Sequence, residues 1–229
     1  ELLGTLVEVK KRQAVSGVDI NLEQAWKTYG NGNHDTIVAM IDTGIDYTHE
    51  DLKDTLWVNT DEIPGNGIDD DGNGYVDDVY GWNFYNNNNQ IFTGEEDSHG
   101  THGAGTISAG TGNGIGIAGI VPGNRVRVMA LKALGGTDGG GSTAAVIKAI
   151  RYAEDNGAVI CNLSLTSTVD DKALYEAMKN SSMLFVVATG NGNPKTGKGV
   201  DTDAIPFYPA AYDLDNIISV ANLSIDGML

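Results

Sequence analysis

Short, almost entirely apolar runs alternate along this chain with segments that have the spacing of amphipathic helices. The apolar runs cover residues 36–41, 126–131, 159–163, 184–188 and 217–220. Such runs are typical of strands buried on both faces of a sheet, and alternating strands and helices favour parallel crossover connections. The pattern therefore predicts an α/β fold with a doubly wound, mostly parallel sheet and helices on both faces.

The segments between these runs predict helices. One follows Asn21, a suitable N-cap residue, and ends at Gly30. A stretch of small residues at 100–110 predicts a tightly packed helix, and Ser142 is expected to cap another that ends near residue 157. A further helix is expected at about 171–180.

Composition fits a globular domain with a substantial core. Of 229 residues, 41% are hydrophobic and 20% charged, so we expect one domain at 21–229 after a lead-in at 1–20. The net charge of −17 argues against nucleic acid and anionic membranes as partners, and no apolar run approaches the length of a membrane span. The lone Cys161 excludes an internal disulfide and predicts a buried thiol.

Two side chains stand out as candidates for acid–base chemistry. Asp42 directly follows the first apolar run, at the strand end where open α/β sheets bind ligands. His99 lies among small residues and offers an imidazole that exchanges a proton near neutral pH. The next histidine, His102, is expected to face the sheet in a structural role.

The triplet Asp42-Thr43-Gly44 has a second interpretation, because aspartic peptidases also use it. Those enzymes need two such aspartates that share a proton. The triplet occurs once in this chain, so a homodimer would have to supply the second. An aspartic peptidase therefore stays open as an alternative.

An acidic loop predicts a calcium site. Asp69, Asp71 and Asn73 alternate, a glycine follows, and Asp77 falls at the ninth place. Alternating oxygen ligands with a glycine at the turn are typical of calcium loops. The twelfth place is Tyr80 rather than a bidentate glutamate. The loop is therefore expected to bind Ca²⁺ without forming an EF-hand.

Three motifs in order, at 39–46, 99–106 and 187–191, make the chain resemble the subtilisin-like serine peptidases, or subtilases, from about residue 20 to the end. The resemblance implies that Asp42 orients His99. It also implies that His99 acts as general base and then general acid towards a serine nucleophile. By the same comparison, the amide of Asn191 would donate to the oxyanion of the tetrahedral intermediate.

The resemblance also implies that the substrate is a polypeptide, bound as an added strand. It assigns substrate contacts to two extended stretches and to the primary specificity pocket, namely Gly139, Gly140, Gly141, Ser164, Leu165, Thr166, Ala188, Thr189 and Gly190. Many members of the family have glycine at the position of Thr166 and alanine at that of Thr189. Both β-branched residues would narrow the pocket.

A second calcium site is implied in the same way. Its ligands would be the side chains of Asp51 and Asn113 and the carbonyls of Ile115 and Ile117. The glycine spacing at 114–119 also matches a dinucleotide fingerprint, but this segment opens no helix, so a nucleotide site is rejected. The glycines would instead let the carbonyls point inward. Ca²⁺ is therefore the expected cofactor.

The chain departs from the family's pattern at the nucleophile, because it contains no Gly-Thr-Ser sequence. We expect the serine on a segment outside these residues, supplied by a complementing C-terminal segment or chain, so that residues 1–229 alone are inactive. A catalytically inactive, peptide-binding relative is the alternative. The resemblance and the calcium loop together predict an extracellular or cell-surface protein.

Overall fold

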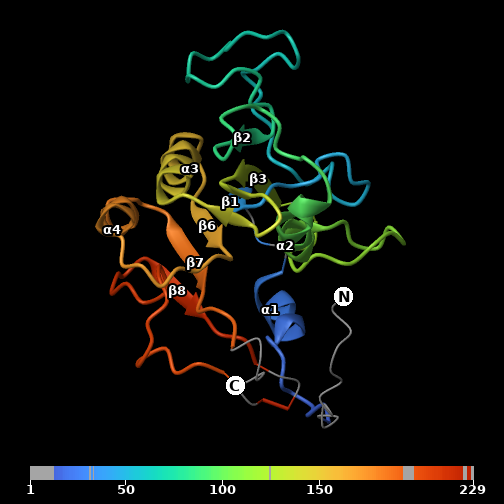
Figure 1. Cartoon of the computed structure of the whole chain (residues 1–229). Helices are drawn as coiled ribbons and strands as arrows, with labels where there is room; N and C mark the ends of the chain where they lie inside the picture. The colour runs from blue at the N-terminus through green and yellow to red at the C-terminus, as the bar shows by residue number, and fades with distance from the viewer. Residues whose placement is uncertain are drawn as a thin grey trace.

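A six-stranded parallel sheet forms the centre of the structure (Figure 1). The computed structural model describes residues 13–30, 32, 34–123, 125–192, 199–223 and 226–227. Residues 1–12 of the expected lead-in lie outside these ranges. The strand order is β2-β3-β1-β6-β7-β8. The bounds are β1 Thr36–Asp42, β2 Gly81–Asn83, β3 Val126–Lys132, β6 Ile160–Leu163, β7 Leu184–Ala188 and β8 Ile217–Val220.

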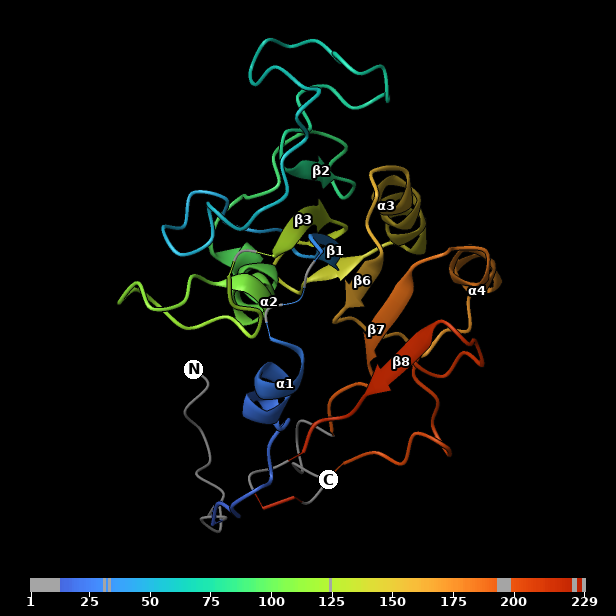
Figure 2. The same cartoon turned by 180° about the vertical axis from the view of Figure 1, so that it is seen from behind.

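The sheet is doubly wound about β1. From β1 the chain moves to β2 and β3 on one side, then returns to β6 on the other side of β1 and continues to β7 and β8. Helix α2 (Ser98–Ser108) covers one face, and α3 (Thr143–Asp155) and α4 (Lys172–Lys179) cover the other (Figures 1 and 2). The predicted fold class is confirmed. The switch in winding direction brings the carboxyl end of β1 to the place where such sheets bind ligands.

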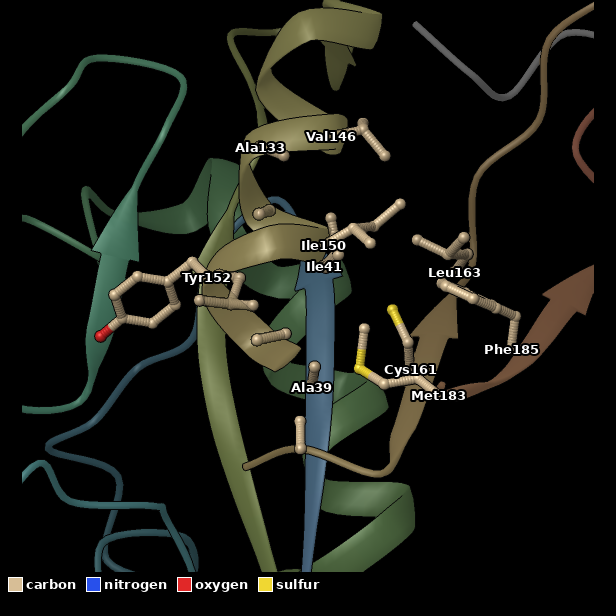
Figure 3. Packing of buried hydrophobic residues seen from close by; sticks show 14 of the residues in the cluster. Ala39, Ile41, Ala133, Val146, Ile150, Tyr152, Cys161, Leu163, Met183 and Phe185 are labelled. Carbon is tan, nitrogen blue, oxygen red and sulfur yellow. The ribbon is translucent and has the colours of Figure 1, made fainter. Parts of the chain in front are cut away.

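Successive residues of β1 pack into two separate hydrophobic cores. Ala39 and Ile41 join the cluster under α3 (Figure 3), whereas Val38 and Met40 join the cluster that contains Ala104 of α2. A strand with helices on both faces needs apolar side chains at every position, because its side chains alternate between the faces. Burial on both faces therefore explains why the sequence of β1 is an almost continuous apolar run.

Helix α1 (Leu22–Tyr29) lies where the sequence predicts it, but Asn21 does not cap it with its side chain. Asn21 has a φ of 53° and makes no side-chain capping hydrogen bond. The backbone N–H of Asn21 donates to the carboxylate of Asp19. At the other end, Gly30 has a φ of 60° and donates to the carbonyl of Trp26, as expected of a terminating glycine.

A short hairpin lies between β3 and α3. Its strands, β4 (Leu134–Gly135) and β5 (Gly140–Gly141), pair antiparallel. Ser142 then caps α3, its side chain accepting a hydrogen bond from the N–H of Ala145, as the sequence predicts. The hairpin thus presents its glycines next to the carboxyl ends of the central strands.

The thiol of Cys161 is fully buried in the cluster under α3 (Figure 3). Burial raises its pKa far above the ordinary value, because the charged thiolate is poorly solvated there. The predicted buried thiol is confirmed. Among the described residues, no helix is both long and apolar enough to cross a membrane.

Candidate active site

Asp42 and His99 form a hydrogen-bonded pair at the carboxyl end of β1. Nδ1 of His99 lies 2.7 Å from Oδ1 of Asp42. The aspartate is 1% exposed, whereas the histidine side chain is 59% exposed. The N–H of Thr43 donates to the same carboxylate oxygen at 2.7 Å. The pair therefore combines a buried acceptor with an imidazole that is open to an incoming group.

Small residues allow helix α2 to pack closely against the turn after β1. A Cβ atom added to Gly100 would lie 2.2 Å from the carbonyl oxygen of Gly44 and 3.2 Å from Cβ of Asp42. The N–H of Gly100 donates to Oγ1 of Thr43 at 3.1 Å. The first turn of α2 thus rests directly on the turn after β1. The run of small residues around His99 has its physical reason in this contact.

The prediction that His102 faces the sheet is wrong, because its side chain is exposed. The buried positions of α2 are Gly100, Ala104, Gly105 and Ser108. His102 lies half a turn away from the first two of these, on the outer side of the helix. It lines a small pocket of about 170 Å³ together with His49 and Asp51.

A cleft of about 890 Å³ opens beside His99. Its walls include both extended stretches predicted to contact substrate, Gly139–141 on the hairpin and Ser164, Leu165 and Thr166 after β6. Ala188, Thr189 and Gly190 are not among the residues that line it. Thr189 instead uses its N–H and its hydroxyl to donate to the carbonyl of Val220. The structure therefore brings His99 and the two extended stretches together, whereas substrate contact by Ala188, Thr189 and Gly190 stays a prediction.

Asn191 follows the end of β7 by three residues. Since β1 and β7 are parallel strands of one sheet, Asn191 and Asp42 lie at the same edge. The side chain of Asn191 is exposed. Its role as an oxyanion donor stays a prediction.

The acidic loop gathers three carboxylates beside β2, at one edge of the sheet (Figure 1). Oxygens of Glu62, Asp69 and Asp71 all lie within 4.8 Å of one another. Glu62 is only 5% exposed, and no motif identifies it in the sequence because it precedes the alternating pattern. A set of carboxylate oxygens suits Ca²⁺, a hard cation that prefers oxygen ligands.

The other predicted ligands of this loop have different neighbours. The carboxylate of Asp77 accepts hydrogen bonds from the N–H groups of Asn66 and Gly67, and Asp77 stands outside the group of three. The side-chain amide of Asn73 donates to Asp71 at 2.9 Å. Partial burial works against the charge of Asp71, but hydrogen bonds, first from the amide of Asn59, outweigh it and lower the pKa of its carboxyl.

The loop is tied to the core through Asp78. This residue is fully buried, and Oη of Tyr152 in α3 donates to its carboxylate at 2.5 Å. Burial and the nearby carboxylate raise the pKa of Tyr152, because both disfavour the phenolate. The geometry of the acidic loop is therefore linked to the helix that packs beneath the sheet.

At the second predicted calcium site, the structure brings Asp51 and Asn113 together. The Asn113 amide donates to Oδ1 of Asp51 at 2.7 Å, and the N–H of Ile117 donates to Oδ2 at 3.2 Å. The N–H of Ile115 donates to the Asn113 oxygen. A Cβ on Gly116 would lie 2.4 Å from Oδ2 of Asp51. The glycine here permits a close approach to a buried carboxylate.

A buried aspartate that bonds an exposed imidazole beside a cleft is an arrangement in which histidine can act as a general base. The sequence model of the subtilase family matches residues 33–228. The chain therefore belongs to the subtilase family, as its motifs predict, and the aspartic-peptidase alternative is removed.

Relatives and a solved structure agree with this assignment. The major intracellular serine protease of Bacillus subtilis is 35% identical, over 82% of this chain and 51% of its own length. The halolysin-like extracellular serine protease Nep of Natrialba magadii is 32% identical, over 89% of this chain and 32% of its own. A lanthipeptide protease structure matches with a TM-score of 0.57 and 25% identity, over 87% of this chain and 52% of that one. This chain thus spans about a third to a half of these proteins.

Proposed function

We propose that this chain forms part of the peptidase domain of a serine endopeptidase whose nucleophilic serine is supplied by a segment outside these 229 residues. The observation that carries the proposal is the 2.7 Å contact between His99 and Asp42 at the mouth of the cleft. Membership of the subtilase family supports it. The conversion of a hydroxyl into a nucleophile needs such a base.

The hydrogen bond to Asp42 decides how His99 would act. A carboxylate only accepts hydrogen bonds, so Nδ1 of His99 carries the proton and Nε2 is left as the basic atom. Nε2 takes the proton of the serine hydroxyl as the oxygen attacks the scissile carbonyl, and Asp42 stabilises the imidazolium. His99 then returns the proton to the leaving amine. The amide of Asn191 would donate to the oxyanion.

The substrate is an extended polypeptide. Gly140 and Gly141 of β5 lie on one wall of the cleft, and Ser164 to Thr166 lie on another. A peptide placed between them would bind through its main chain, as an added strand, so recognition tolerates many sequences. Thr166 lines this cleft, and its β-branched side chain narrows it compared with glycine.

Ca²⁺ is the cofactor that the acidic side chains fit. Glu62, Asp69 and Asp71 would hold one ion. Asp51 and Asn113, which lie together, would hold a second with the carbonyls of Ile115 and Ile117. The ions take no part in the proton transfers. Their contribution is to neutralise carboxylates that repel one another and to fix two surface loops.

An extracellular or cell-surface location is part of the proposal. One relative is named an extracellular protease, while another is named intracellular. The acidic loop favours an extracellular location, because calcium-binding modules of low affinity are occupied by Ca²⁺ outside the cell. The acidic net charge makes nucleic acid and anionic membranes unfavourable partners. The partner that completes the site is the segment or chain that carries the serine.

A fluorophosphonate probe tests the proposal on the intact gene product. We expect covalent labelling of one serine outside residues 1–229, and loss of labelling in a His99→Gln variant that still folds. A Glu23→Gln variant at an exposed helix position serves as the matched control and should label normally. A folded wild-type protein that takes no label would show the peptide-binding alternative to be the correct one.

A further inference from the structure

A buried ion pair lies beneath the candidate active site. Lys132 and Asp97 are both 0% exposed, and Nζ of the lysine lies 2.5 Å from Oδ1 of the aspartate. The same Nζ donates to the carbonyl of Thr43 at 2.5 Å. Oδ2 of Asp97 accepts from the N–H and the hydroxyl of Thr93. Neither charge is left without partners.

Such a pair needs a reason other than stability. The cost of removing two charges from water offsets most of their attraction, and well-packed apolar residues often serve a core equally well. The proposed reaction does not use either charge. The pair's place in the fold therefore has to supply the explanation.

The two partners flank the catalytic pair. Lys132 ends β3 directly opposite Asp42 in the register of the two parallel strands. Asp97 ends the short helix η1 (Glu95–Asp97), two residues before His99. The ion pair thus joins the strand next to the aspartate with the segment that leads into the histidine's helix. These two elements must keep a fixed separation for the 2.7 Å contact to persist.

Thr43 connects the ion pair with the catalytic pair, and all its polar atoms are bonded. Its N–H donates to Oδ1 of Asp42, and its hydroxyl oxygen accepts from the N–H of Gly100, the residue after His99. Its carbonyl accepts from Lys132. Loss of the ammonium group would free this carbonyl and the turn that carries it.

We propose that Lys132 and Asp97 are positioning residues, which hold Asp42 and His99 in bonding geometry through Thr43. Neither touches the substrate. The kinetic consequences rest on the proposed peptidase function, whereas the consequences for the hydrogen bond between His99 and Asp42 do not. These two kinds of measurement therefore separate a failure of this inference from a failure of the proposed function.

The test uses the intact gene product with a double substitution, Lys132→Met and Asp97→Asn. Both charges are removed together, and the asparagine keeps an acceptor for Thr93, so neither charge is left buried alone. We expect kcat for a peptide substrate to fall by roughly 10- to 100-fold with KM within about twofold, because misplacement of a catalytic group costs rate rather than binding. We also expect the Nδ1–H proton resonance of His99 to move or disappear.

Two further variants keep the test decisive. Met178→Ala, in the core under α4, should lower the melting temperature while leaving kcat and the His99 resonance unchanged. Thr43→Val, which removes the acceptor of Gly100, should reproduce the loss of kcat and the altered resonance even if the double variant does not fold. A double variant with wild-type kcat and an unchanged resonance would overturn the proposal, as would a Thr43→Val variant with both unchanged. If the wild-type protein cleaves no peptide, the resonance alone decides.

Discussion

From the contact between α2 and the turn after β1, we predict how much Gly100→Ala lowers the free energy of unfolding. The added Cβ would lie 2.2 Å from the carbonyl oxygen of Gly44, a backbone atom that cannot rotate away. Overpacking of this kind costs about 1–3 kcal/mol of the free energy of unfolding. The helix would relieve the overlap by moving outward, which lengthens the 2.7 Å contact between His99 and Asp42.

Gly105→Ala is the matched control, because it makes the same chemical change in the same helix. Its Cβ would lie 3.7 Å from Ile117 and 3.9 Å from Leu52, at ordinary contact distances. Alanine restricts the unfolded chain more than glycine does, so this variant should be more stable by about 0.5–1 kcal/mol. The two substitutions are therefore expected to change stability in opposite directions.

Urea unfolding followed by tryptophan fluorescence measures both effects. In a domain of this size each kcal/mol corresponds to about 2–4 °C in melting temperature, so thermal melts would also resolve them. The Gly100→Ala variant should in addition lose peptidase activity, whereas Gly105→Ala should keep it. Equal stabilities of the two variants would refute the argument that close backbone contact fixes α2 against β1.

Three further predictions concern the acidic loop. Excess EGTA should lower the melting temperature, since a site filled at 100 times Kd contributes about 2.7 kcal/mol. Glu62→Gln should reduce this response, leaving the part due to the second site, and Glu23→Gln should not; an unchanged melting temperature in the wild type would exclude a stabilising ion. Tyr152→Phe should cost about 1.5–3 kcal/mol in urea unfolding, because Asp78 is buried and loses a hydrogen bond; a loss below 0.5 kcal/mol would contradict this. The folded-state pKa of Asp71 lies below its ordinary 3.8, so its contribution is full above about pH 5 and disappears as the pH falls through the folded pKa; in EGTA, Asp71→Asn should flatten the acid limb, and an unaltered limb would count against the assignment.

Much of the fold could be predicted from local pattern, because strands buried on both faces are apolar at every position. The same reasoning placed α1, α3 and α4 within a few residues of their bounds. It missed β2, β4 and β5, which are two or three residues long and rich in glycine. Such strands are formed by pairing with a neighbour, and pairing partners leave no periodic signal in a short segment.

The candidate site shows the same division. Asp42 and His99 could be found because each stands in a recognisable motif, and the structure joins them. Glu62 and Lys132 could not be found, since their partners are close in space but stand at separations in the sequence that no spacing rule covers. A lysine that closes an apolar strand was the available signal for Lys132, because a buried ammonium requires an acid nearby.

The rate of peptide hydrolysis by an Asp42→Asn variant of the intact gene product tests the central claim most directly. The asparagine keeps the shape of the side chain but favours the wrong imidazole tautomer at His99. We expect kcat to fall by about 10⁴-fold while KM and the melting temperature change little. A variant that folds and retains kcat within tenfold of the wild type would show that this pair does not carry the chemistry.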